Sequence, residues 1–311
     1  MKIDKNFFPG WVRKSITFTI DDGDLKLDKI FLDTVKPYGI LGTFNIPTLK
    51  LKEHSADEYR EMYRGYGISN HCKYHPLAFE DGVEYDISDD KFDPASADTS
   101  KLYKAGEPGV YKKFRENNQR WSTIADTDAY IALASANLQE LYEVFGEANV
   151  HGYCWPYCIQ KNENVVREVR AMHEWVRGSG YSKDESYGMP KERADWHYTA
   201  NYKNLTEEAK KYEAFEDDGE LKFFCFGVHS FDFDRNGCWN ILEDFVKKYG
   251  NRPENYYYAD IHTIFTYEDA VNGIIEDEEG IYNPSDVTVY IKADGKRVTV
   301  PAKSKILFKN V

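Results

Sequence analysis

The sequence of 311 residues has no long apolar run. A helix that spans a bilayer needs roughly 20 consecutive apolar residues, and no stretch approaches that length. The first residues also lack the apolar core and the small-residue cleavage site of a signal peptide. We therefore expect no contact with membranes and a cytoplasmic location.

Cysteine is scarce, and its count is odd: the five residues are Cys72, Cys154, Cys158, Cys225 and Cys238. An odd count fits reduced thiols better than a disulfide framework. Cys154 and Cys158 are too widely spaced for a CxxC redox motif, and no second pair of cysteines supports a zinc knuckle.

Positive charge is also in deficit, because 40 Lys and Arg face 53 Asp and Glu, which gives a net charge of −13. This balance argues against nucleic acids and anionic membranes as partners. The chain contains 24 Tyr and 18 Phe, and an acidic, tyrosine-rich surface suits neutral ligands such as sugars. With 41% hydrophobic and 30% charged residues, the sequence is typical of a globular protein with a substantial core.

Two adjacent acids stand where the first clear strand ends. Residues 15–20 alternate polar and apolar side chains and are rich in β-branched types, which predicts a strand with one buried face. The pattern stops at Asp21, Asp22 and Gly23. Such a sequence is also typical of a simple turn, so this stretch leaves two interpretations open.

Alternating helices and strands follow. A helix over 27–38 and a strand over 40–46 complete a βαβ unit, which predicts a parallel sheet. We expect further helices over 55–66, with Ser55 and Glu58 as a capping box, and over 127–145, 162–175, 204–215, 237–249 and 267–275, and strands over 150–158, 176–178, 221–228 and 256–261.

The domain organisation follows from this alternation. We expect a barrel-like α/β domain over 1–281, with polar insertions near 77–121 and 179–202. The first insertion is long enough to help shape a substrate cleft. A β-hairpin over 286–291 and 297–308, joined through Asp294 and Gly295, makes 282–311 an appended β-extension.

Histidines provide the second chemical signal. His71 and His75 are four residues apart after Asn70, a plausible cap, and on a helical turn both imidazoles would share one face and could grip one metal ion. A pair of surface histidines is the alternative. His229 follows the apolar strand over 221–228. The remaining histidines, which we expect in surface or core roles without convincing partners, are His54, His151, His173, His197 and His262.

Three strand ends therefore carry residues that could act together. An Asp with two His is a recurrent ligand set of hydrolytic metal sites and leaves positions for water and substrate. A second carboxylate can remove a proton from that water, and a histidine opposite can protonate a leaving group.

In this order along the chain, the motifs resemble those of the NodB-homology polysaccharide deacetylases, carbohydrate esterase family 4. TFTIDDG over 17–23 resembles the family's TFDDG motif, and SNHCKYHP over 69–76 resembles NH(S/T)xxHP. Residues 153–157 resemble the RxPY(G) motif, and Val228 with His229 resembles the end of LxH. The matches span roughly residues 15–229.

The resemblance implies a fold and roles for six residues. The fold would be α/β, a distorted, incomplete (β/α) barrel of the NodB-homology type, here with the appended C-terminal β-hairpin. Asp21 would be the catalytic base and His229 the general acid, and the backbone N–H of Tyr157 would stabilise an oxyanion. The implied metal ligands are Asp22, His71 and His75.

Departures from the family pattern concern the third and fourth motifs. The Arg that normally orients the base is Cys154 here, and the closing Gly is Cys158. Of the fourth motif only Asp195 and Trp196 are present, at an uncertain alignment. Arg177, at a later strand end, is our candidate to replace the missing Arg, although an Arg that only caps the strand or pairs on the surface is equally consistent.

These features predict a metal-dependent hydrolase that removes acetyl groups from a carbohydrate. On family grounds we expect N-acetyl groups, with O-acetyl groups as the alternative, and a divalent metal, zinc before cobalt or nickel. Two other functions stay open: a related barrel that hydrolyses a small non-sugar amide, and a carbohydrate-binding protein that has lost turnover along with the motif Arg.

Overall fold

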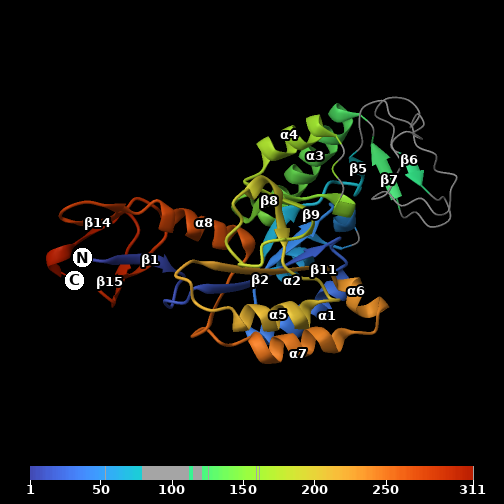
Figure 1. The fold of residues 1–311 in the computed structure, drawn as a ribbon. Coiled ribbons are helices and arrows are strands. Elements are labelled where there is room, and N and C mark those ends of the chain that lie inside the picture. Colours follow the sequence, from blue (N-terminus) through green and yellow to red (C-terminus); the bar gives the residue numbers. More distant parts are fainter. Residues whose placement is uncertain are drawn as a thin grey trace.

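The computed structural model of this chain describes residues 1–52, 54–78, 112–114, 121–124, 126–158, 160 and 162–310. Its centre is a sheet of eight parallel strands (Figure 1). In order across the sheet these are β10 (Trp196–Tyr198), β9 (Trp175–Tyr181), β8 (Val150–Cys154), β4 (Gly67–Asn70), β3 (Thr43–Ile46), β2 (Lys14–Asp21) and β11 (Lys222–His229), with β12 (Tyr256–Tyr258) beside the first half of β2.

The two outer strands of this sheet approach each other. After β10 the chain returns to β11, where Ala200 forms a bridge with Phe226, and the N–H of Thr199 donates to the Cys225 carbonyl at 2.7 Å. No continuous ladder closes the sheet within the described residues. The sheet is therefore a distorted, incomplete (β/α) barrel, as the sequence predicts.

Strand β2 is buried on both faces. Ile16, Phe18 and Ile20 pack in the main hydrophobic cluster under the helices. Thr17 and Thr19 are fully buried on the other face, where Thr19 meets side chains from β3 and from β9, a strand that is not its neighbour. The expectation of one buried face was wrong, because the polar face of β2 lines the interior of the barrel instead of the solvent.

Helices surround the outer face of the curved sheet. Figure 1 shows α1, α5, α6 and α7 on one side and α3 and α4 on the other. Their bounds are α1 (Leu25–Val35), α2 (Ala56–Met62), α3 (Thr127–Phe145), α4 (Glu163–Met172), α5 (Leu205–Ala214), α6 (Ser230–Arg235), α7 (Trp239–Tyr249) and α8 (Ile261–Asn272). None of the described helices is long and apolar enough to cross a membrane.

Helix starts follow the caps in the sequence. Ser55 and Glu58 form the expected capping box of α2. Helix α8 begins six residues before the expected position 267, because the carboxylate of Asp260 accepts from the N–H of Thr263 at 3.1 Å and caps it. The short helix α6, directly after His229, was not expected.

The C-terminal β-extension contains the expected hairpin, formed by β15 (Val289–Ala293) and β16 (Lys296–Val300). Its turn residues Asp294 and Gly295 both have positive φ, 47° and 81°, as a two-residue primed turn requires. The second expected strand is interrupted after Val300, and β17 (Ser304–Leu307) pairs instead with β14 (Gly280–Asn283), which also pairs with β13 (Ile275–Glu276).

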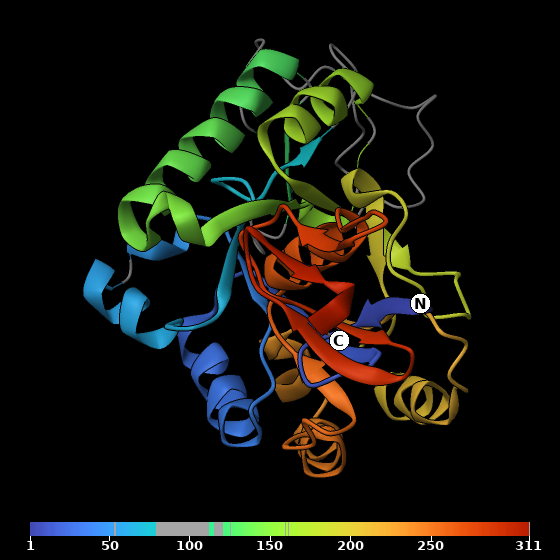
Figure 2. The same cartoon turned by 90° about the vertical axis from the view of Figure 1, so that its left-hand side faces the viewer.

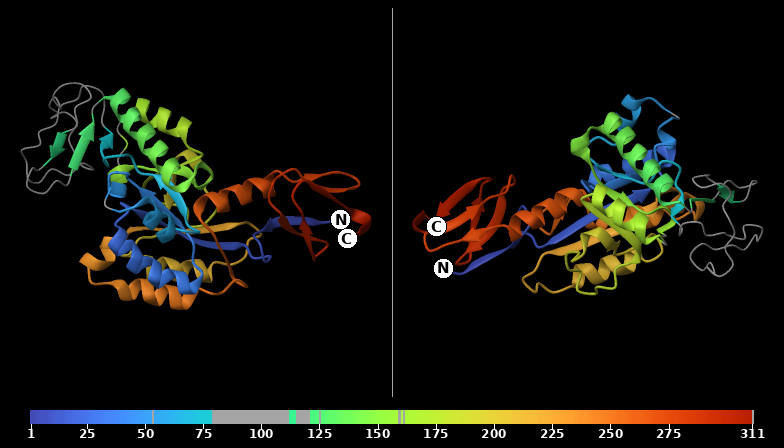
Figure 3. Two further views of the ribbon diagram at one scale, coloured as in Figure 1. Left: turned by 180° about the vertical axis from the view of Figure 1, so that it is seen from behind. Right: turned by 90° about the horizontal axis from the view of Figure 1, so that it is seen from above.

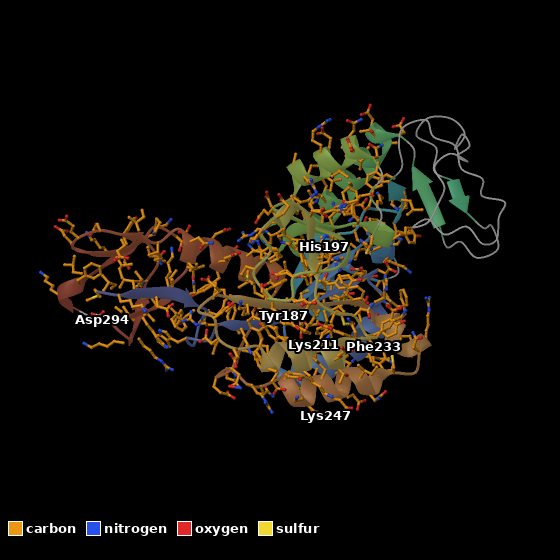
Figure 4. All side chains as sticks on the ribbon, viewed as in Figure 1. Tyr187, His197, Lys211, Phe233, Lys247 and Asp294 are labelled. Atoms are coloured by element: carbon orange, nitrogen blue, oxygen red, sulfur yellow. The ribbon has the colours of Figure 1, made fainter. Side chains whose placement is uncertain are left out.

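The N-terminus joins this extension, a pairing that the sequence did not reveal. Strand β1 (Ile3–Phe7) runs antiparallel to β15. Figure 2 shows the extension facing the viewer, and both termini lie at its end in Figures 1 and 3. In Figure 4, Asp294 marks the extension, and Phe233 of α6 lies on the barrel, away from it.

Helix α8 connects the extension to the barrel. Ile264 and Phe265 of α8 share one buried cluster with Phe223, near the start of β11, and with Ile291 of β15. The extension therefore packs at the amino ends of the parallel strands, and their carboxyl ends stay away from it.

The expected insertion near 77–121 lies largely outside the described residues. Its predicted role in shaping a substrate cleft therefore stays a prediction. Of this segment the structure describes β5 (Leu77–Ala78) and the strands β6 (Lys112–Phe114) and β7 (Trp121–Ile124), which pair with each other. The expected domain boundary at residue 282 stays a prediction.

Asp28 generates a testable prediction about stability. This aspartate is fully buried in the first turn of α1, where the Tyr63 hydroxyl donates to it at 2.7 Å. Burial raises its pKa to about 7, against the smaller lowering effects of Ser230 and Tyr63. A raised folded-state pKa favours folding at low pH, and this contribution is lost as the pH rises through 7.

We expect Asp28→Asn to remove this pH dependence. Between pH 4 and 8 the wild-type chain would lose about 4 kcal/mol of unfolding free energy that the variant keeps. Urea unfolding at both pH values measures the difference, and Asp33→Asn, an exposed change on the same helix, serves as control. Parallel pH curves for wild type and Asp28→Asn would contradict the prediction.

Candidate metal centre and catalytic site

The candidate site lies at the carboxyl ends of the parallel strands. Strand register places His229 beside Asp21, and Asp21 beside Asn45. Farther along the sheet it places Cys154 beside Arg177. Because parallel strands end at one edge, residues distant in sequence meet there. The structure brings together the side chains of Asp21, Asp22, His71, His75, Tyr157 and His229 at this edge.

Asp22 and the two histidines converge. The Oδ1 atom of Asp22 lies 3.3 Å from Nε2 of His71 and 3.1 Å from Nε2 of His75. The three potential ligand atoms all lie within 4.8 Å of one another. Asp22 has a positive φ of 77°, a conformation that Asp tolerates better than most residues.

The two histidines do not share a helical turn, so that part of the sequence interpretation was wrong. Strand β4 ends at Asn70, and the following loop carries positive φ at Cys72 and His75, 53° each. Asn70 holds this loop, because its Oδ1 accepts from the N–H of Cys72 at 2.9 Å and from the Asn137 amide at 2.8 Å. The loop, and not a helix face, brings the imidazoles together.

The hydrogen bond of His71 and the pKa shifts of Asp22 and His75 suit a metal ion. His71 donates from Nδ1 to the Cys154 carbonyl at 2.8 Å, which leaves the lone pair of Nε2 facing Asp22. Burial would raise the pKa of Asp22, but the neighbouring imidazoles hold it well below its ordinary value. Burial lowers the pKa of His75 despite the charge of Asp22. An ionised carboxylate and neutral imidazoles are the forms that bind metals.

Two buried atoms of this group support the same conclusion. Within the described part of the chain, Asp22 Oδ1 and His71 Nε2 are buried and have no hydrogen-bond partner. Buried polar atoms without partners are costly and rare. A divalent cation bound by Asp22, His71 and His75 would satisfy both, so the residues present fit the metal that the sequence implies.

Asp21 is held by three side chains. The Asn45 amide donates to its Oδ1 at 2.6 Å, and Nη2 of Arg177 donates to its Oδ2 at 2.5 Å. The thiol of Cys154 lies 3.6 Å from Oδ1. Burial raises the pKa of Asp21, but Arg177 and, less strongly, the nearby histidines outweigh it and lower the pKa below its usual value. Asp21 is thus a fixed, ionised carboxylate beside the candidate ligand group.

Arg177 contacts Asp21, the carboxylate that the motif Arg of the family would orient. Because Cys154 and Arg177 are register partners on β8 and β9, the small thiol leaves room for the guanidinium of the neighbouring strand. Arg177 also donates from Nη1 to the Thr19 hydroxyl at 2.7 Å, and its side chain is 1% exposed. It neither caps a strand nor pairs on the surface.

His229, the register neighbour of Asp21, also comes close to Asp22. Its Nε2 lies 3.9 Å from Asp22 Oδ2, and its Nδ1 donates to Asp232 at 2.9 Å. Phe231 stacks on the imidazole at 4.5 Å between ring centroids. Burial lowers the pKa of His229, but Asp232 and the two site aspartates outweigh burial and raise it to about 9, so that this histidine carries a proton at neutral pH.

Of the remaining residues, Tyr157 lies at the site, whereas Asp195 and Trp196 of the fourth motif contact other residues. The Tyr157 ring packs edge-on against His75 at 4.3 Å. Asp195 accepts from Gln160 and pairs with Arg170 of α4, and Trp196 packs against Trp175 and Phe265.

Sequence reasoning missed Asn45, Asp232 and Phe231. Asn45 had a usable signal, since it is a polar residue at the end of an apolar strand, just before Pro47. Asp232 stands three residues after His229, the spacing at which a side chain can reach back across a helix start.

No family model and no curated protein matches the sequence. Several solved structures are similar in fold. One is a family 4 acetyl xylan esterase from Clostridium thermocellum in complex with a cobalt ion, with 13% identity, a TM-score of 0.43, and coverage of 82% of this chain and 92% of that chain.

A second is the Xyl-CE4 domain of a multidomain xylanase from the hindgut metagenome of Trinervitermes trinervoides (12% identity, TM-score 0.46, 83% and 92% covered). A third is a polysaccharide deacetylase from Bacillus cereus (14% identity, TM-score 0.43, 80% and 93% covered). The solved structures to which this chain is similar thus include members of carbohydrate esterase family 4, the family that its sequence motifs resemble.

Proposed function

We propose that this protein is a metal-dependent hydrolase that removes acetyl groups from a carbohydrate. The observation that supports it most is that Asp22, His71 and His75 converge at one edge of the sheet with the buried carboxylate of Asp21 and the imidazole of His229. A metal ligand set with a carboxylate base and an imidazole acid nearby supplies the groups that metal-assisted hydrolysis of an acyl bond uses.

The chain's own residues would divide the proton transfers. A cation held by Asp22, His71 and His75 would lower the pKa of a water molecule and polarise a carbonyl. Asp21 takes a proton as the water oxygen adds to the acetyl carbonyl carbon, and Arg177 and Asn45 keep its carboxylate in place. His229 gives its proton to the departing nitrogen or oxygen as that bond breaks, which yields acetate and the free amine or alcohol. The backbone N–H of Tyr157 is the proposed oxyanion donor.

The substrate class rests on the motif resemblance. We favour N-acetyl groups of an amino sugar over O-acetyl groups, and zinc over cobalt or nickel. The alternative of a binding protein without turnover drew its support from the missing motif Arg, and the position of Arg177 weakens that support.

Removing a metal ligand tests the proposal most simply. We expect Asp22→Ala to lose the metal ion at this site and acetate release from acetylated chitooligosaccharides or acetylated xylan, because two imidazoles alone bind a divalent ion weakly. Elemental analysis and an acetate assay measure the two effects, with the exposed Asp33→Ala as control. An Asp22→Ala variant that still released acetate at the wild-type rate would rule out this mechanism.

A substitution of His229 distinguishes the proposed role of general acid from that of a metal ligand. We expect His229→Gln to keep the metal content and to lower kcat by about 100- to 10,000-fold, the usual contribution of general acid catalysis. Metal content and kcat measured on the same preparation check this. Loss of the metal with His229→Gln would instead make His229 a ligand.

Arg177 is the proposed positioning residue for Asp21. We expect Arg177→Ala to lower kcat by about 100-fold through a misplaced base, with KM and metal content little changed. Arg177→Lys keeps the charge, so partial recovery of kcat is expected. If both variants unfold at the same denaturant concentration as wild type and turn over normally, Arg177 has no role in positioning.

A further inference from the structure

A second group of chemically active side chains lies at the other end of the barrel. His151 is the second residue of β8, Glu174 directly precedes β9, and His262 is the second residue of α8. The N–H of Glu174 donates to the His151 carbonyl at 3.0 Å, so the two are neighbours at the amino ends of their strands. The expectation that His151 and His262 lack convincing partners was therefore wrong.

Both imidazoles point at one carboxylate. Nδ1 of His151 lies 2.9 Å from Oε1 of Glu174, and Nδ1 of His262 lies 3.0 Å from Oε2. The potential ligand atoms of the three residues lie within 4.8 Å of one another. The two rings stack at 3.3 Å between centroids.

A hydrogen bond at Nε2 of His151 determines whether its Nδ1 carries a proton or a lone pair. Nε2 of His151 lies 3.0 Å from the Ala148 carbonyl, which only accepts, so this nitrogen carries the proton. In a neutral ring the lone pair of Nδ1 then faces a carboxylate oxygen at 2.9 Å. Because a lone pair and a carboxylate oxygen repel each other, this arrangement needs a positive charge between the two atoms. The same pattern, with a backbone carbonyl fixing the other nitrogen, occurs at His71.

We propose that His151, Glu174 and His262 bind a second divalent transition-metal ion, independent of the proposed catalytic one. Two imidazole nitrogens and a carboxylate suit zinc, nickel or copper, with water completing the coordination. Solvent reaches the group, since the Glu174 side chain is 59% exposed and that of His262 is 28% exposed. The ring planes are parallel within 4°, so the His262 ring turns out of the stack to direct its lone pair at the ion.

The role of this ion would be structural. His262 lies in the first turn of α8, and α8 connects the barrel to the C-terminal extension. An ion shared with β8 and the residue before β9 would fasten that helix to the barrel. Binding to the folded chain alone also raises its thermal stability.

Metal stoichiometry of the full-length, tag-free protein tests this proposal. After removal of metal with a chelator and titration with zinc, we expect two equivalents per chain in the wild type and one in His262→Gln. Zinc should raise the melting temperature of Asp22→Ala, which keeps the second site, and should not raise that of Asp22→Ala/His262→Gln. Glu174→Gln, a change at an exposed side chain, should weaken this site at least tenfold.

His54→Gln is the matched control, because His54 also pairs with a glutamate, Glu58 at 3.6 Å, but belongs to none of the potential metal-binding groups among the described residues. A wild-type chain that binds one equivalent, all of it lost in Asp22→Ala, would overturn the second site and leave the proposed function intact. An unchanged count in His262→Gln would overturn it as well. If His262→Gln alters only the pH dependence of melting, the group shares a proton instead of a metal.

Discussion

The ion pair between Asp21 and Arg177 is the contact on which the candidate site depends. Both side chains are nearly inaccessible, 8% and 1% exposed, and a buried charge is tolerated only when it is paired and hydrogen-bonded. Thr19 and Asn45 complete the pairing from β2 and β3, so the barrel interior, usually apolar, is polar at this level. Removing one partner of such a pair costs about 3–5 kcal/mol. The pair joins β2 to β9 across the barrel and fixes the carboxylate beside which Asp22 and its histidines lie.

Local sequence patterns sufficed for the features that depend on near neighbours. The parallel βα order, the capping box at Ser55 and the turn at Asp294 and Gly295 all follow from residues a few positions apart. Long-range pairing did not follow, because nothing near β1 in the sequence shows that it pairs with β15. The sequence supported a contact between Arg177 and Asp21 only as a hypothesis, for the same reason. This contact depends on the register of β8 and β9, which the sequence alone does not reveal.

The two ends of the barrel have different tasks in this account. At the carboxyl ends, polar side chains converge and two buried ligand atoms lack hydrogen-bond partners among the described residues, a state that folding alone does not favour and that suits a functional site. At the amino ends, α8 and the extension cover an apolar cluster. His262 at the start of α8 and its partners His151 and Glu174 lie where these two parts of the chain meet, so the proposed second ion would bear on how firmly the extension is attached.

The presence of an ion between Asp22, His71 and His75 is the claim that matters most here. Anomalous diffraction from crystals of the zinc-loaded protein, recorded on both sides of the zinc absorption edge, locates such an ion without reference to activity. The account predicts a strong peak within about 2.0–2.2 Å of Asp22 Oδ and of one nitrogen of each histidine. Fully occupied crystals with zinc elsewhere and no peak among these three side chains would contradict it.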